Sequence, residues 1–224
     1  MRSLIEALLD AVAPRRCPGC SEVCAKNWCD ACGEPEPLLA AGSVAGVPVV
    51  VAGVYAGALA RAITRFKYEP RPELAAPLGR LLVDVAQNHV LPEDLVWAPV
   101  PLHFERLVER GFNQSALLAR ELALATRRPM HARLLCRQRD TGHQVELGRS
   151  ERAANVRDAF QVRAPSSRAV ALVDDVVTTG ATAEACIEAL RKKDVHVHAV
   201  FALARTVPGR GPSPRARERP AAER

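Results

Sequence analysis

Apolar residues along the chain form short runs that are typical of strands and longer stripes at helical spacing. We predict strands at residues 47–54, 95–100, 170–173 and 195–202. Helices are predicted where apolar side chains recur at helical spacing, at residues 58–68, 74–90, 115–126 and 181–192. Strands that alternate with helices indicate an α/β domain with an open, mostly parallel sheet, which we place at residues 45–206.

The first residues of the chain predict an amphipathic helix. Its apolar stripe consists of Leu4, Ile5, Leu8, Leu9 and Val12. The segment is similar to a signal peptide, but Glu6 and Asp10 interrupt its hydrophobic region. No stretch approaches the roughly 18 apolar residues that a membrane helix needs. We therefore expect a cytoplasmic protein.

Five of the seven cysteines fall between positions 17 and 32. They include two C-x-x-C pairs, Cys17 with Cys20 and Cys29 with Cys32, eight residues apart. Four thiolates predict a tetrahedral zinc site of structural type, because they leave no coordination position open. Redox-active or merely buried thiols are the alternative, and Cys24 is a spare thiol that could replace a ligand. We predict an N-terminal helix and zinc ribbon over residues 1–40, in a reducing compartment.

Charge adds little to this picture. The 224 residues carry a formal net charge of +6, and half of it lies in residues 208–224, which hold five arginines and two glutamates. We predict a disordered basic tail at residues 207–224, because this segment has no apolar pattern. The folded part is only mildly basic, which suggests an anionic partner without identifying it.

The strongest chemical motif lies at residues 170–182. The apolar strand ends in Asp174 and Asp175, where open α/β sheets place their ligands. A turn of small residues then leads into a helix and predicts a cradle for one phosphate, formed by Thr178, Thr179, Gly180, Ala181 and Thr182. Adjacent carboxylates can bind vicinal sugar hydroxyls, so the motif suits a ribose 5-phosphate. The alternative is that the two aspartates only end a strand and cap a helix.

Residues 170–182 resemble the 5-phosphoribosyl-1-diphosphate (PRPP) binding motif of type I phosphoribosyltransferases. Residues 17–205 as a whole resemble the ComF family of competence-associated, phosphoribosyltransferase-like proteins. Besides the cysteine pairs, the second resemblance rests on Tyr55-Ala56-Gly57, Arg61, Phe66-Lys67-Tyr68, Pro99-Val100-Pro101-Leu102, Arg106, Arg110-Gly111-Phe112-Asn113-Gln114, Arg139, Thr141, Gln144, Glu151, Arg152 and Asn155. The chain departs from the family pattern at Pro70 and His143.

The resemblance implies roles for further residues. Val100 and Pro101 correspond to the loop that contacts diphosphate, and Arg106 and Arg110 become candidates for phosphate binding. A solvated position on a helix surface is the alternative for each arginine. Residues 137–155 correspond to a mobile hood over the site, where Arg139 and Arg152 are candidates for phosphate binding, with a solvated surface position as the alternative. Mg²⁺ would accompany the diphosphate.

Two main functions follow from the resemblance. One is Mg²⁺-dependent ribosyl transfer from PRPP, with Asp174 and Asp175 as catalytic residues beside an oxocarbenium-like transition state. The other is a non-catalytic competence factor that binds single-stranded DNA at the same site, together with competence-machinery proteins. A sensor of PRPP is a third alternative. Fold alone does not decide among these functions, and no residue identifies an acceptor.

Overall fold

The computed structural model describes residues 14–38, 41–69, 71–137, 159–163 and 168–209. The described residues form a five-stranded sheet in the order β1-β2-β7-β6-β3. Its strands are β1 (Ser43–Val44), β2 (Val47–Val54), β3 (Val96–Pro99), β6 (Val170–Val177) and β7 (Val197–Arg205). Strand β1 is antiparallel to β2, and the other neighbours pair in parallel. The prediction of a mostly parallel α/β sheet is confirmed.

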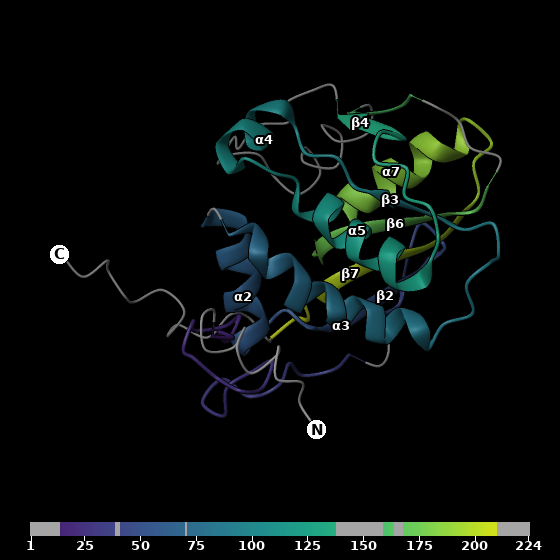
Figure 1. Cartoon of the computed structure of the whole chain (residues 1–224). Helices are drawn as coiled ribbons and strands as arrows, with labels where there is room; N and C mark the ends of the chain where they lie inside the picture. The colour runs from purple at the N-terminus through teal and green to yellow at the C-terminus, as the bar shows by residue number, and fades with distance from the viewer. Residues whose placement is uncertain (1–13, 39–40, 70, 138–158, 164–167, 210–224) are drawn as a thin grey trace.

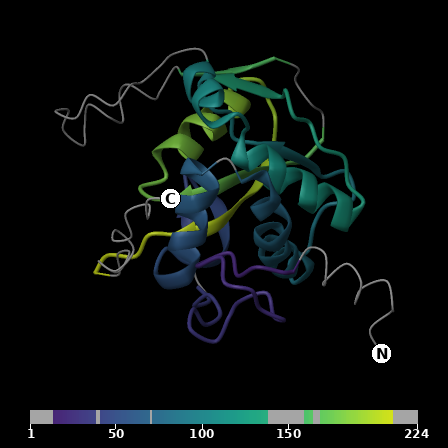
Figure 2. The same cartoon turned by 60° about the vertical axis from the view of Figure 1, so that its left-hand side comes forward.

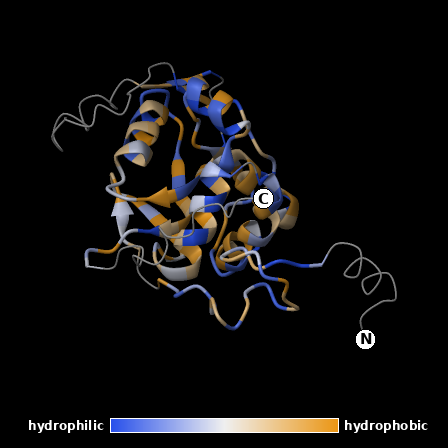
Figure 3. Cartoon of the chain, turned by 90° about the vertical axis from the view of Figure 1, so that its left-hand side faces the viewer, coloured by the Kyte–Doolittle hydropathy of each residue, from blue (hydrophilic) through white to orange (hydrophobic). Residues whose placement is uncertain are grey.

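Helices cover both faces of this sheet (Figure 1). The helices are α2 (Gly57–Tyr68), α3 (Ala75–Gln87) with the short 3-10 helix η1 (Pro72–Leu74) before it, α4 (Phe104–Arg110), α5 (Gln114–Thr126) and α7 (Ala181–Arg191). One core contains residues of α2, α3 and α5, and the other contains residues of α7. Apolar residues therefore concentrate on the strands and on the inward helix faces (Figure 3).

The cysteine-containing segment lies against α2 (Figures 1 and 2). Cys17 and Trp28 are 1% and 6% exposed and belong to the same core as Ala58 and Ala62 of α2. Trp28 thus packs inside the protein. The segment is joined to the α/β domain by a shared core.

Several boundaries differ from the sequence-based expectations. Strand β6 runs to Val177, so the acidic pair lies within the strand instead of after it. The strand continues because β7 supplies parallel partners as far as Arg205. A small antiparallel ribbon, β4 (Leu135–Arg137) with β5 (Phe160–Val162), flanks the segment that we expected to form the hood. The predicted N-terminal helix, most of the hood and most of the tail lie outside the described residues.

Candidate functional site

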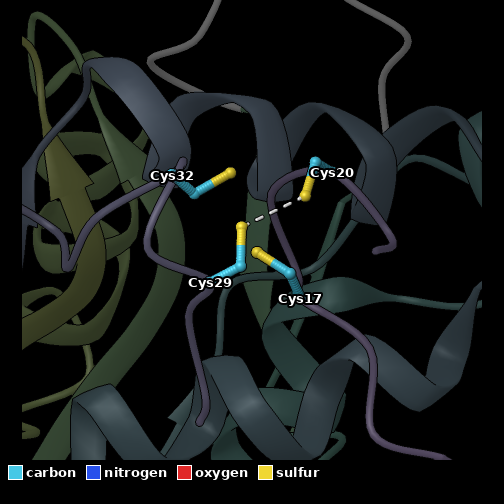
Figure 4. Close-up of side chains that lie close together, drawn as sticks. All are labelled: Cys17, Cys20, Cys29 and Cys32. Carbon is cyan, nitrogen blue, oxygen red and sulfur yellow. Dashed lines mark hydrogen bonds between the residues drawn. The ribbon is translucent and has the colours of Figure 1, made fainter. Parts of the chain in front are cut away.

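The four cysteines of the two C-x-x-C pairs form a cluster. Their sulfur atoms all lie within 4.8 Å of one another and point toward a common centre (Figure 4). The Sγ atoms of Cys20 and Cys29 are 3.5 Å apart. Metal–sulfur bonds of about 2.3 Å in a tetrahedron place sulfurs about 3.8 Å apart. The cluster can therefore hold one metal ion, and Cys24, whose thiol donates to the Lys26 carbonyl oxygen, is not part of it.

Helix α2 supports this cluster directly. A Cβ atom on Gly19 would lie 3.1 Å from the Cys32 sulfur and 3.3 Å from the Cβ of Ala58, so the segment and α2 are in close contact here. Arg61 donates to the Cys32 sulfur at 3.3 Å. One turn later, Arg65 donates to the Pro18 carbonyl oxygen at 2.9 Å. These bonds fix the cysteine segment to one side of α2.

The cysteine thiols influence one another's ionisation. Burial acts to raise the pKa of Cys17, but backbone N–H groups that include those of Cys29 and Cys20 lower it to about 7. Burial raises the pKa of Cys20 to about 12, and the neighbouring sulfurs of Cys29 and Cys32 add to this effect. The Cys20 thiol therefore resists ionisation, and a bound cation would favour its thiolate form.

The acidic pair lies inside the protein at the carboxyl end of β6. Asp174 is partly buried and Asp175 is 7% exposed. The Asp174 Oδ1 atom accepts hydrogen bonds from the Ser115 hydroxyl at 3.1 Å and from the Asp175 backbone N–H at 2.8 Å. Burial, followed by the charge of Asp175, raises the pKa of Asp174 to about 7. The hydrogen bonds thus hold Asp174 in place, although burial and the neighbouring charge disfavour its ionised form.

Lys67 supplies a positive charge to this pair. Its Nζ atom lies 2.8 Å from the Asp175 Oδ1 atom. Burial alone would lower the pKa of Lys67, but the charge of Asp175 and the hydrogen bond to it raise the pKa. The end of α2 is fixed above the pair because the Gln114 side chain donates to the Phe66 carbonyl oxygen at 3.1 Å. The ion pair between Lys67 and Asp175 is therefore held in a fixed position within the site.

The predicted phosphate loop connects β6 to α7. Thr178 and Thr179 are exposed, and Gly180 has φ +88°. A Cβ atom on Gly180 would lie 2.7 Å from a methyl group of Val44. The backbone N–H of Ala181 donates to the Thr179 hydroxyl at 3.4 Å, and residues 176–183 with Asp174 line a small cavity of about 30 Å³. The loop therefore lines a small polar cavity at the N-terminus of α7.

A larger cavity of about 330 Å³ joins these parts. It brings the acidic pair and two threonines of the loop together with the predicted diphosphate loop and three cationic side chains. Its principal lining residues are Lys67, Val100, Pro101, Arg110, Arg137, Asp174, Asp175, Thr178 and Thr182. Arg110 lies with its guanidinium 5.3 Å from the centre of the Tyr68 ring, and its Nε is buried without a hydrogen-bond partner among the described residues.

Other predicted residues are not brought to this cavity. Arg106 lies on α4, pairs with Glu109 at 2.6 Å and is not among the residues lining the cavity. Arg139 and Arg152 lie outside the described residues. Sequence reasoning missed Lys67, Ser115 and Gln114 as parts of the site. Lys67 and Gln114 are among the residues that carry the family resemblance. Nothing in their spacing indicated that Gln114 would contact Phe66, 48 positions away, or that Lys67 would contact Asp175, 108 positions away.

The fold and this cavity define an open α/β protein with a polar cavity beside the end of β6 and an attached four-cysteine module. No protein-family model matches the chain. It is 35% identical to Competence protein F of Haemophilus influenzae over 167 residues, covering 70% of this chain and 72% of that protein. It is 32% identical to DNA utilization protein YhgH of Salmonella typhi over 209 residues, covering 84% and 91%. The chain belongs to this Competence protein F and YhgH family, the ComF family.

Solved structures give a more distant likeness. The glutamine PRPP amidotransferase of B. subtilis, complexed with ADP and GMP, is 19% identical with a TM-score of 0.41, over 62% of this chain. The match spans only 30% of that chain. Adenine phosphoribosyltransferase of Leishmania donovani is 16% identical with a TM-score of 0.37, covering 65% and 67%. None of the helices in the described ranges is long and apolar enough to cross a membrane.

Proposed function

We propose that this protein binds PRPP. The observation that carries the proposal is the single cavity of about 330 Å³, which borders both the acidic pair and the phosphate loop. Residues 178–182 would hold the 5-phosphate through backbone N–H groups and threonine hydroxyls. Asp174 and Asp175 would accept hydrogen bonds from the ribose hydroxyls. A sugar with its 5-phosphate fits this order of groups along one wall.

Other lining residues of the cavity suit the diphosphate. Val100 and Pro101 line the cavity beside Arg110. The buried Nε of Arg110 has no hydrogen-bond partner among the described residues, and a phosphate oxygen would satisfy this donor. Arg106, Arg139 and Arg152 remain proposed contributors from α4 and from the hood.

Mg²⁺ fits the site in part. Carboxylate oxygens are ligands that Mg²⁺ accepts, and it usually keeps substrate phosphates and water among its other ligands. However, one oxygen of Asp174 already accepts two protein hydrogen bonds, and one oxygen of Asp175 contacts Lys67. We propose that Mg²⁺ arrives with the diphosphate and neutralises its charge. Asp174 and Asp175 are the residues that would face it.

The arrangement would also serve ribosyl transfer. The bond between the anomeric carbon and the diphosphate oxygen would break, the diphosphate would leave with the bonding electrons, and a nucleophile would form the new bond to that carbon. Asp174 and Asp175 would stabilise positive charge on the ribose during this step, and Arg110 would stabilise the leaving group. The nature of the nucleophile is not part of the proposal.

The cysteine cluster is proposed to bind structural zinc. Its four sulfurs have the separations of a tetrahedral thiolate site. Four protein ligands would leave no coordination position for a substrate. All seven cysteines are free thiols, which supports a reducing, cytoplasmic location.

A second candidate function is binding of single-stranded DNA. The names of the relatives refer to competence and to DNA utilization. Tyr68 is 67% exposed and has the guanidinium of Arg110 over its ring. An exposed aromatic ring beside an arginine is a combination that binds single-stranded nucleic acid. In this alternative, the phosphate loop would hold a DNA phosphate, in concert with other competence proteins.

Calorimetric titration tests the two candidates together. The purified protein is titrated with PRPP and Mg²⁺, and then with PRPP in the presence of a short single-stranded oligonucleotide. We expect saturable PRPP binding with one site per chain, weakened by the oligonucleotide if DNA occupies the same cavity. Absence of PRPP binding, with tight DNA binding, would contradict the primary proposal and favour the second.

A further inference from the structure

Lys67 reaches the acidic pair from a different part of the fold. It lies in the last turn of α2, while Asp175 lies in β6, and their side chains are only 20% and 11% exposed. The neighbouring residue Phe66 is bound through its carbonyl oxygen to Gln114, which is 1% exposed. The lysine is therefore held at the pair by buried contacts on the adjacent backbone, and its position does not depend on a flexible loop.

The surroundings of Lys67 explain why a cation is needed there. Asp174 and Asp175 are adjacent carboxylates with little exposure to water, and their charges repel each other. Lys67 lines the same cavity as Arg110 and Arg137, and its Nζ atom lies 2.8 Å from an oxygen of Asp175. Lys67 thus places a positive charge in direct contact with the pair.

A bound PRPP would bring more negative charge close to the acidic pair and Lys67. The ligand carries a diphosphate and a phosphate, and its ribose would lie against two carboxylates. A lysine ammonium has three N–H donors, and the contact with the Asp175 oxygen uses one of them. The ammonium can therefore donate to a ligand oxygen while it stays beside Asp175.

We propose that Lys67 is a ligand-binding residue that bridges the acidic pair and the diphosphate, and so makes PRPP binding only weakly dependent on Mg²⁺. This inference rests on the proposed function. The inference goes beyond the proposed function because it assigns to Lys67 of α2 part of the charge neutralisation that Mg²⁺ would otherwise supply.

The test compares affinities with and without Mg²⁺. The dissociation constant for PRPP is measured by calorimetry in Mg²⁺ and in EDTA, for the parent and for Lys67→Met, which keeps the length of the side chain and removes its charge. Lys193→Met, at an exposed position after α7, is the matched control. We expect the parent and the control to bind in both conditions, and Lys67→Met to lose at least about tenfold more affinity in EDTA than in Mg²⁺.

Three results would overturn the inference. An equal loss for Lys67→Met in both conditions would mean that the lysine is only structural, and absence of parent binding in EDTA would mean that Mg²⁺ is essential. Absence of parent binding in both conditions would refute the proposed function as well. If Lys67→Met does not fold, Lys67→Arg keeps the charge and serves as the second variant. Lys67→Arg is expected to bind in EDTA within about tenfold of the parent, and failure to do so would also contradict the inference.

Discussion

Replacing Asp174 by asparagine should change how the stability of the protein depends on pH. Asparagine has nearly the same size and keeps a carbonyl oxygen that can accept from the Ser115 hydroxyl and from the Asp175 backbone N–H. The substitution therefore removes the charge and preserves the hydrogen bonds that the structure shows. In the parent, burial and the charge of Asp175 raise the pKa of Asp174 from 3.8 to about 7.

The sign and size of the effect follow from this pKa. Between about pH 4 and pH 7, the folded protein keeps a proton on Asp174 that the unfolded chain has already lost. The free energy of unfolding therefore falls as the pH rises through this range, and the fall ends above the folded pKa. Each unit of pKa difference corresponds to about 1.4 kcal/mol, so the whole effect is at most about 4 kcal/mol.

Urea unfolding of the parent and of Asp174→Asn at about pH 5 and about pH 8 measures this effect. Groups away from the pair titrate alike in both proteins, so the stability difference between variant and parent isolates the contribution of Asp174 and the groups in contact with it. We expect this difference to shift in favour of the variant by roughly 1–3 kcal/mol between the two pH values. Asp84→Asn, at an exposed position of α3, should show no such shift. A difference that stays constant for Asp174→Asn would refute the reasoning.

Two further predictions concern the cysteine module and the phosphate loop. Elemental analysis should find one zinc per chain, and purified protein without zinc would contradict this prediction. Replacing Cys17 and Cys20 by serine should remove the metal and lower the melting temperature, because structural zinc contributes folding free energy. Gly180→Ala should lower the free energy of unfolding by about 1–3 kcal/mol through strain and contact with Val44. Gly46→Ala has a similar φ but no such neighbour, and an equal loss there would show that contact is unimportant.

Much of the fold was predictable from local patterns. The apolar runs and stripes located β2, α2, α5 and α7 within a few residues, because amphipathic periodicity is a local property. The end of β6 was missed because its last four residues include two aspartates, and only the pairing with β7 keeps them in the strand. Local sequence carries no information about such a partner.

The parts of the site that lie in one continuous stretch of sequence were predictable, and the parts that come from distant segments were not. The motif at residues 174–182 is continuous, so its aspartates, threonines and glycine could be recognised together. The contacts of Lys67 and Ser115 with the aspartates join segments that are far apart in sequence. They depend on how α2 and α5 pack on the sheet. Arg106 shows the converse, because its proximity in sequence to Arg110 does not bring it to the cavity.

The most direct test of the account measures two ligands with one variant. Asp174→Asn combined with Asp175→Asn keeps the shape of the pair and removes both charges. We predict that the affinity for PRPP with Mg²⁺ falls at least about tenfold, because charged acceptors of the ribose hydroxyls are lost. Affinity for single-stranded DNA should be equal or higher, because two carboxylates that repel phosphate are gone. Unchanged PRPP affinity in a folded double variant would contradict the assignment of the acidic pair as the ribose site.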